Sequence, residues 1–365
     1  MSEFGCTLRR EEQAVFALRG LYETYGYAPY KMSKFEEYDL YVRNKEFLIS
    51  DGVITFTDTD GKLMALKPDV TLSIIKNSRD EAGCVQKVYY NENVYRVSED
   101  AHCFKEILQT GLECMGDIDD GCVYEVLTLA AESLRRIAPR AVLDVSHLGV
   151  VDGLLAGVTA EGRRAVCHCL GEKNPHELAK VCDAYGISAD VAATLTALVR
   201  LYGAPAKVIP ALRELVGDTD AVAQLSRLTE ALDRAGYGDV VRIDFSVVDE
   251  GSYYNGIVFR GFVEGVPDSV LSGGQYDRLM RQMGRRGGAI GFAVYLDRLG
   301  RMAEAAREYD VDTLLLYEEG CDLTALSAAA DQIRAEGSVM LQKEIPAQLT
   351  YRRLCRFENE EVKPV

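Results

Sequence analysis

Residues 104–113 of the chain read FKEILQTGLE, and this stretch decides how the fold is interpreted. Side chains of an extended strand alternate between two faces, so Gln109, Gly111 and Glu113 share one face. Two polar side chains on either side of a glycine suit the wall of a pocket better than a packed surface. The stretch therefore predicts a strand that lines a binding site.

Short alternating or β-branched runs lie on both sides of this stretch and predict antiparallel strands. Residues 8–26 and 121–138 carry apolar residues at helical spacing and predict helices, which end at Gly26 and before Pro139. Strand patterns stop near residue 148 and return near 240, so two separated stretches of sequence join in one sheet. The predicted strands are Val53–Thr57, Lys62–Lys67, Gln86–Val97, Ile107–Met115, Ala141–Val145, Val240–Val248, Ile257–Val263 and Ala289–Ala293.

These patterns divide the chain into three regions. Residues 1–147 and 239–310 predict an α+β core, an antiparallel sheet flanked by helices. Residues 148–238 are helical in pattern and predict an insertion into that core. Residues 311–342 read as strand, helix and strand, so 311–365 predict a small α/β tail.

Composition limits the class of function. The 365 residues include 57 acidic and 41 Lys or Arg residues, a net charge of −16, so nucleic-acid binding requires a local basic face. We find neither an apolar run of about 18 residues nor a secretory leader, and we expect a cytoplasmic protein without membrane association. The ten cysteines form no CxxC pair and are expected to be reduced. No metal and no cofactor are expected, because residues 167–169 (CHC) point to different faces of a helix.

Further segments combine polar chemistry with strand ends. Residues 66–71 (LKPDVT) place Asp69 and Thr71 at a turn from strand to helix. Residues 251–256 (GSYYNG) and 271–277 (LSGGQYD) supply tyrosines as flat walls with a polar tip, and a Gly273-Gly274 turn that backbone or ligand can approach closely. Each motif alone also fits a solvated strand edge or turn. Together, carboxylates and tyrosines suit an amino acid with a basic or imidazole side chain.

In this order, the motifs resemble the catalytic core of histidyl-tRNA synthetase, a class II aminoacyl-tRNA synthetase, over about residues 8–310. The matching segments are Lys67–Thr71, Tyr95-Arg96 through Gln109 and Glu113 (motif 2), Tyr253–Phe259 and Gly273–Asp277 (the two histidine-binding peptides), and Ala289–Leu299 (motif 3).

The resemblance implies a class II synthetase-like sheet and a set of site residues. Glu113 and Gln109 would hold an ammonium or imidazole group, and the tyrosines would wall the ring. Arg96 and Arg298 would contact a phosphate-bearing ligand such as ATP, or serve as structural ion-pair partners. Residues 20–45, similar to motif 1, would build a homodimer interface. The implied histidine pocket is formed by Asp69, Thr71, Gln109, Glu113, Tyr253, Tyr254 and Tyr276.

The departures from the synthetase pattern concern charge. An arginine is expected shortly before the two tyrosines, but residues 248–252 read VDEGS and offer Asp249 and Glu250. A unit charge about 4 Å from a phosphate contributes on the order of 1 kcal/mol in water and about 4 kcal/mol at a protein-like dielectric. Reversing its sign removes several kcal/mol of transition-state stabilisation. The loop at residues 98–102 (SEDAH) is also acidic, so we expect adenylation to be lost.

The C-terminal tail also differs from the synthetase by being more acidic. Residues 302–365 hold 13 acidic against 7 basic residues, a net of −6, in a segment shorter than the synthetase's anticodon-reading domain. Its one basic cluster comprises Arg352, Arg353 and Arg356, which we interpret as a helix face or subunit contact in preference to an RNA contact. We therefore expect no tRNA binding.

A synthetase-like core that has this pocket but lacks the arginine needed for adenylation and a basic RNA-binding tail resembles the regulatory subunits of ATP phosphoribosyltransferase. That resemblance implies a non-catalytic chain in a hetero-oligomer, required with a short catalytic subunit for the first step of histidine biosynthesis and contributing to feedback by L-histidine. Two alternatives stay open, an active histidyl-tRNA synthetase and a free-standing histidine-activating enzyme or sensor.

Overall fold

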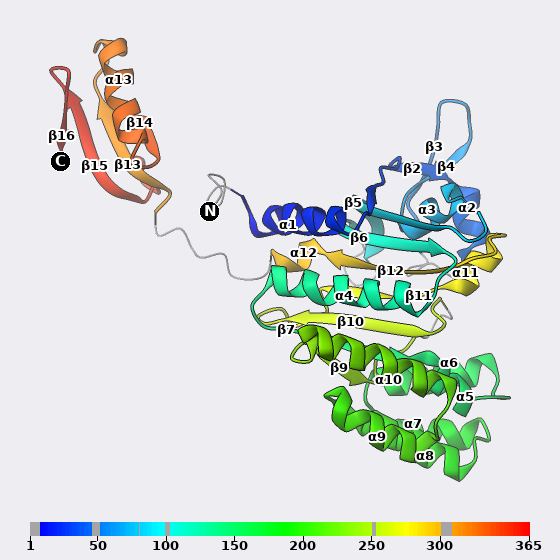
Figure 1. Cartoon of the computed structure of the whole chain (residues 1–365). Coiled ribbons are helices and arrows are strands. Elements are labelled where there is room, and N and C mark those ends of the chain that lie inside the picture. Colours follow the sequence, from blue (N-terminus) through cyan, green and yellow to red (C-terminus); the bar gives the residue numbers. More distant parts are fainter. Residues whose placement is uncertain (1–7, 46–51, 80, 99–102, 250–252, 301–308) are drawn as a thin grey trace. The chain divides into compact units, whose positions relative to one another are not determined.

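The structure is a computed structural model that describes residues 8–45, 52–79, 81–98, 103–249, 253–300 and 309–365. By contacts, the chain divides into two compact units, residues 1–302 and 303–365, and each is described by itself. Figure 1 shows the elements of both units.

A mixed sheet is the centre of the first unit, and nine strands form it in the described part of the chain. Most neighbours are antiparallel, whereas β1 with β5 and β7 with β9 are parallel. All eight predicted strands are observed, six of them in this sheet. Across the sheet, the strands are β1 (Ala28–Pro29), β5 (Val85–Ser98), β6 (Cys103–Gly116), β12 (Gly288–Tyr295), β11 (Leu271–Gln275), β10 (Ile257–Val263), β7 (Ala141–His147), β9 (Val241–Asp244) and β8 (Tyr202–Gly203).

The sheet has one apolar and one polar face. Directly paired residues of adjacent strands share a face, so the register places Glu113 of β6, Gly291 of β12 and Gly274 of β11 in one row. The next row on that face contains Ser272 of β11 and Arg260 of β10. Both rows lie on the face that the alternation in FKEILQTGLE predicts to be a pocket wall.

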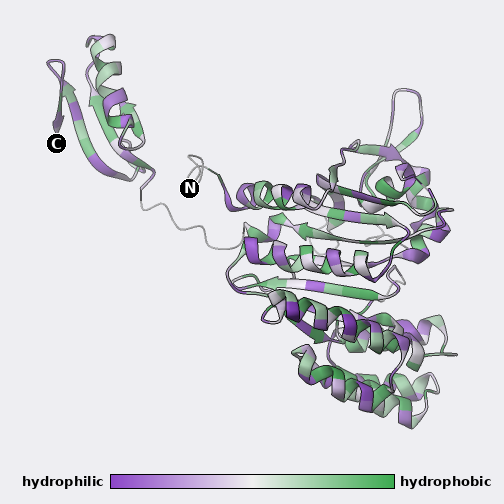
Figure 2. Cartoon of the chain, in the orientation of Figure 1, coloured by the Kyte–Doolittle hydropathy of each residue, from purple (hydrophilic) through white to green (hydrophobic). Residues whose placement is uncertain are grey.

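Helices α1 (Arg10–Thr24) and α4 (Asp120–Ile137) pack against one another at the apolar face. Val123, Val126, Leu127, Ala130 and Leu134 recur at helical spacing and are fully or almost fully buried in the main core. The Asp119 carboxylate caps the first turn of α4, and Pro139 cannot continue the helix. In Figure 2 the sheet strands are mainly hydrophobic, whereas the helices mix hydrophobic and hydrophilic positions.

Residues 148–237 fold into helices between β7 and β9, with the short strand β8 among them. Four side chains each cap a helix by accepting a hydrogen bond from the backbone N–H of its third residue; they belong to Thr159, Asn174, Ser188 and Thr219. The helices are α5 (Leu148–Leu154), α6 (Ala160–Gly171), α7 (Pro175–Ala184), α8 (Ala189–Arg200), α9 (Pro205–Val216) and α10 (Asp220–Leu232), followed by the π-helical turn η2 (Asp233–Tyr237).

A small three-stranded sheet and short helices complete the first unit. Their buried residues pack with Tyr90, Tyr276 and Ala289 of the large sheet region in a second core. None of the described helices is long and apolar enough to span a membrane. The remaining elements of this unit are β2 (Phe35–Glu37), β4 (Leu63–Leu66), β3 (Thr55–Thr57), α2 (Tyr38–Arg43), α3 (Thr71–Asn77), α11 (Asp277–Gln282) and α12 (Leu296–Leu299).

The second unit is a four-stranded sheet packed on α13 (Leu323–Arg334). Strand β13 (Val311–Tyr317) pairs in parallel with β14 (Val339–Gln342) and with β15 (Tyr351–Glu358), which pairs with β16 (Glu361–Pro364). The predicted strand, helix and strand of residues 311–342 are observed. The interpretation of Arg352, Arg353 and Arg356 as a helix face is wrong, because all three lie on β15.

One prediction about the core also needs correction. The sequence predicts a turn at Gly273 and Gly274, but both residues lie within β11 and pair with β10 and β12. A Cβ on Gly274 would come within 2.8 Å of the Tyr254 ring, and one on Gly273 within 2.5 Å of Phe292 Cβ. Glycine is required here by close packing inside the sheet, and the sequence pattern alone does not distinguish that from a turn.

Candidate functional site

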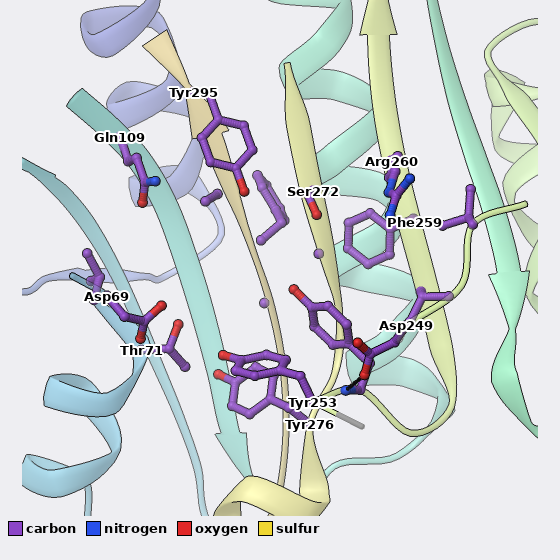
Figure 3. A pocket seen from close by; sticks show the side chains of 18 of the residues that line it. Asp69, Thr71, Gln109, Asp249, Tyr253, Phe259, Arg260, Ser272, Tyr276 and Tyr295 are labelled. Carbon is purple, nitrogen blue, oxygen red and sulfur yellow. Dashed lines mark hydrogen bonds between the residues drawn. The ribbon is translucent and has the colours of Figure 1, made fainter. Parts of the chain in front are cut away.

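A cavity of about 480 Å³ lies over the polar face of the large sheet (Figure 3). Strands β5, β6, β10, β11 and β12 contribute to it, together with the start of α3, the C-terminal end of α6 and the segment before β10. Its volume is within the range of sites that enclose small molecules, about 300–1,000 Å³. The polar or ionisable residues among those that line it are Asp69, Thr71, Tyr90, Arg96, Gln109, Glu113, Glu172, Asp249, Tyr253, Tyr254, Arg260, Ser272, Tyr276 and Tyr295.

All seven residues predicted for the pocket line this one cavity. Gln109 and Glu113 come from the same face of β6, as the alternation predicts, and are 4% and 2% exposed. Thr71 is the first residue of α3 and Asp69 lies just before it, whereas Tyr253, Tyr254 and Tyr276 come from segments flanking β10 and β11. Residues far apart in sequence therefore converge on one site.

Glu113 is the carboxylate at the buried end of the cavity. Thr71 Oγ1 donates a hydrogen bond of 2.8 Å to its Oε1, and the Tyr276 hydroxyl donates to its Oε2. Burial raises the pKa of Glu113 to about 8; the hydrogen bonds from Tyr276 and Thr71 lower it and the charge of Asp69 raises it. A cationic ligand would favour the ionised form, so Glu113 is suited to bind an ammonium or imidazolium group.

Asp69 is the second buried carboxylate of the cavity. Its Oδ1 accepts a hydrogen bond of 3.0 Å from the backbone N–H of Leu72, which holds it at the first turn of α3. Burial raises the pKa of Asp69, and the Leu72 N–H and the charge of Arg96 oppose that shift. Asp69 and Glu113 together give this end of the cavity an affinity for positive charge.

Three tyrosines form an aromatic wall beside these carboxylates. The rings of Tyr253 and Tyr254 meet edge to face with centroids 4.6 Å apart, and Tyr253 lies 5.7 Å from Tyr276. Burial raises the pKa of all three well above the usual value, so their hydroxyls stay neutral hydrogen-bonding groups. Aromatic faces tolerate a positive or planar ligand group, which fits an imidazole ring.

Glycines keep the floor of the cavity open. A Cβ on Gly291 would overlap the carboxylate of Glu113, and one on Gly111 would lie 2.5 Å from the Tyr90 hydroxyl. Gly111 and Gly291 face Tyr90 and Glu113 across neighbouring strands. These positions therefore accommodate the polar side chains that line the cavity.

The charged residues that the sequence comparison singles out, both the departure at Asp249 and the matches at Arg96 and Arg298, have different positions. Asp249 lines the cavity, and its Oδ2 accepts a hydrogen bond of 2.7 Å from the Tyr254 N–H. Arg96 lines it too, and its Nε donates to the Pro68 carbonyl at 3.0 Å. Arg298 is not among the lining residues: it hydrogen-bonds Ser269 and its guanidinium lies 4.4 Å from the centre of the Tyr295 ring. Glu250 and residues 99–102 lie outside the described residues.

Sequence reasoning missed several residues of the site, chiefly Tyr90, Glu172, Arg260, Ser272 and Tyr295. Arg260 carries a signal that could have identified it, because it is the one charged residue in the otherwise apolar run IVFRGFV. The other four become site residues only through strand register or the position of α6, which local patterns do not reveal.

A largely antiparallel sheet with a polar cavity on one face and helices on the other defines a class II aminoacyl-tRNA synthetase-like protein. The chain belongs to the histidyl-tRNA synthetase family, whose profile matches residues 6–299. The predicted α+β, class II synthetase-like fold is thereby confirmed.

Among its relatives, the ATP phosphoribosyltransferase regulatory subunit of Oceanobacillus iheyensis is 26% identical over 91% of this chain and 84% of that protein. Two solved structures share the fold. One, an ATP phosphoribosyltransferase regulatory subunit/histidyl-tRNA synthetase from Bacillus halodurans, has a TM-score of 0.77 at 24% identity, covering 95% of this chain and 93% of that one. The other belongs to an ATP phosphoribosyl transferase (HisG:HisZ) complex from Thermotoga maritima, with a TM-score of 0.62 at 18% identity and coverage of 81% and 97%.

Proposed function

We propose that this chain is a non-catalytic regulatory subunit of ATP phosphoribosyltransferase, required with a short catalytic subunit for the first step of L-histidine biosynthesis. One observation carries the proposal. The cavity has a cation-binding end built from Glu113, Thr71 and Tyr276, whereas the Asp249 carboxylate lies before the tyrosines, where a synthetase-like chain is expected to have arginine. The regulatory-subunit name of the Oceanobacillus iheyensis relative and the complex from Thermotoga maritima support the same role.

L-Histidine is the proposed effector of this cavity. Its ammonium and imidazole groups match the carboxylates of Glu113 and Asp69, and the ring of Tyr253 or Tyr254 supplies a flat wall. Gln109, buried on the same strand face as Glu113, adds an amide that can both donate and accept a hydrogen bond. Histidine regulates the complex only if it binds two arrangements of the assembly with unequal affinity.

The proposal includes a homodimer built by residues 20–45. Phe35 of β2 and Val42 of α2 are about half exposed, and a second copy of the chain could cover these apolar side chains. The net charge of −6 in residues 302–365 argues against a phosphate-binding surface, so the proposal includes no tRNA. A cytoplasmic location fits the nine described cysteines, all of which are free thiols.

Two assays on the full chain test the proposal. The purified protein alone is expected to show no histidine-dependent ATP–pyrophosphate exchange above background. Mixing it with a short phosphoribosyltransferase catalytic subunit is expected to raise phosphoribosyl-ATP formation and to make it sensitive to histidine. Robust exchange by the chain alone, sensitive to Glu113→Gln, would support a histidine-activating enzyme instead and contradict the proposal.

A further inference from the structure

One positively charged side chain that lines the cavity, that of Arg260, is not among the residues that the resemblance implies. Arg260 lies on β10, among the apolar residues of IVFRGFV, and lines the same cavity as Glu113. Figure 3 shows it on the opposite side of the cavity from Asp69 and Thr71. An arginine is unusual in an otherwise apolar strand, and Arg260 is exposed where it lines the cavity, so its guanidinium is accessible to a ligand.

The protein itself supplies no such partner within the described residues. Arg260 makes neither a hydrogen bond nor an ion pair to any of them, and its side chain is exposed to the cavity. The other arginine that lines the cavity, Arg96, differs in both respects: it donates to the Pro68 carbonyl and its charge is opposed by Asp69. Arg260 is therefore the cavity arginine with no hydrogen bond or ion pair to the described residues, whereas Arg96 has its Nε engaged, so all the donors of Arg260 are available to a ligand.

The acidic groups around Arg260 do not neutralise it. Asp144 of β7 is directly opposite in the register, yet it forms no ion pair with Arg260, and the charges that lower the pKa of Asp144 are those of Lys173 and Arg242. Asp249 and Glu172 line the cavity but make no described ion pair with Arg260. On the other side, Ser272 of β11 is directly paired with Arg260 and offers a hydroxyl to the same space.

We propose that Arg260, assisted by the Ser272 hydroxyl, forms an oxyanion subsite that binds the α-carboxylate of the amino-acid ligand. This inference rests on the proposed function, because it concerns the same cavity. A guanidinium and a hydroxyl are suitable donors for a carboxylate. The cavity then offers carboxylates to the ammonium and imidazole groups, and Arg260 to the α-carboxylate that shares a carbon atom with the ammonium group.

The spacing across the sheet fits this assignment. Glu113 on β6 and the row of Arg260 on β10 are separated by β12 and β11, so three strand intervals of about 4.8 Å give about 14 Å between their backbones. The side chains of Glu113 and Arg260 are long enough to cover part of that distance. An amino acid with an imidazole side chain covers the remainder, with its imidazole and ammonium groups towards Glu113 and Asp69. Its α-carboxylate, which is bonded to the same carbon as the ammonium group, faces Arg260.

Ligands that differ at one end test the subsite. We suggest calorimetric titration of the full chain with L-histidine and with L-histidinol, in which a hydroxymethyl group replaces the carboxylate. Wild-type protein is expected to bind histidine at least tenfold more tightly than histidinol, because a hydrogen bond to a charged group contributes about 1.5–3 kcal/mol. Arg260→Gln is expected to weaken histidine binding about tenfold or more and to change histidinol binding less than twofold. Arg260→Lys should recover part of the difference.

The control is Arg140→Gln, an exposed arginine that pairs with Glu264 and does not line the cavity. It should leave both affinities unchanged. If wild-type protein binds histidine but Arg260→Gln weakens both ligands equally, or neither, the carboxylate subsite is wrong and the proposed function stands. If inorganic phosphate binds in an Arg260-dependent way while histidine and histidinol bind alike, the anion is a free phosphate and the assignment fails. If the wild-type chain binds no histidine, the subsite and the effector assignment of this cavity fail, whereas the regulatory-subunit proposal is decided separately by the mixing assay.

Discussion

Thr71 Oγ1 donates a hydrogen bond of 2.8 Å to Glu113 Oε1, joining the first turn of α3 to strand β6. The contact links two buried polar side chains at the end of the cavity that we propose binds a cation. The Tyr276 hydroxyl donates to the other carboxylate oxygen. Glu113 is therefore held in one orientation before a ligand arrives, which reduces the ordering that binding requires.

Replacing Glu113 should weaken regulation and leave assembly intact. Glu113→Gln keeps the shape and removes the charge, so the histidine concentration needed for half-inhibition of the mixed complex should rise about tenfold or more. Phosphoribosyl-ATP formation at increasing histidine concentration measures this. Glu106→Gln, on the same strand but exposed and bonded to Tyr95, is the matched control. Wild-type sensitivity in Glu113→Gln would place the effector site elsewhere.

A local pattern is enough to predict the position of some residues that line the cavity. The alternation of residues 104–113 places Gln109 and Glu113 on one face from the sequence alone, because the strand period of two needs no tertiary information. Asp69 and Thr71 were recognised because a strand-to-helix turn offers polar groups. These predictions depend only on neighbours in the chain.

The residues that were missed depend on contacts between distant segments. Ser272 and Arg260 share the cavity because β10 and β11 pair in a particular register, which alternation within either strand does not specify. Gly273 and Gly274 were placed in a turn because glycine is typical of turns, whereas here the close approach of Tyr254 and Phe292 requires it. Tertiary packing decided each of these positions.

The pKa of Glu113 predicts a pH dependence of stability. Folding raises this pKa from 4.5 to about 8, so the folded chain retains a proton that the unfolded chain loses over that range. The contribution of Glu113 to the free energy of unfolding is therefore fully present below pH 4.5 and falls as pH rises to 8, by up to about 1.4 kcal/mol per pH unit. Glu113→Gln should remove this decline.

Urea denaturation at several pH values between 5 and 9 measures the effect as the difference between the two proteins. Asp144, whose pKa burial raises to about 7, contributes a similar decline to both and cancels in that difference. The stability of Glu113→Gln relative to wild type should rise with pH and level off above about pH 8. A difference that is constant across the range would contradict the neutral, buried state of Glu113.

Gly291 should be intolerant of even a methyl group. A Cβ there overlaps the Glu113 carboxylate and lies 2.5 Å from the Leu112 carbonyl oxygen, so Gly291→Ala should lower the free energy of unfolding by about 1–3 kcal/mol and weaken histidine binding. Gly20→Ala is the control, because nothing lies within 4 Å of its Cβ position on α1. A helical glycine replaced by alanine should gain about 0.5–1 kcal/mol. If Gly291→Ala is as stable as Gly20→Ala, the residues around Gly291 can rearrange to accommodate a methyl group, and the prediction is wrong.

The proposed homodimer makes a prediction about surface charge. Phe35 is 49% exposed on β2 and Val42 is 51% exposed on α2, both within residues 20–45. Phe35→Glu would place a carboxylate in the apolar contact, where its desolvation opposes association. Wild-type protein should sediment at twice the chain mass of 40.3 kDa, and the variant should shift towards that single mass. Leu323→Glu, at a 72% exposed site on α13, should remain dimeric. If Leu323→Glu dissociates and Phe35→Glu does not, the interface lies on the second unit.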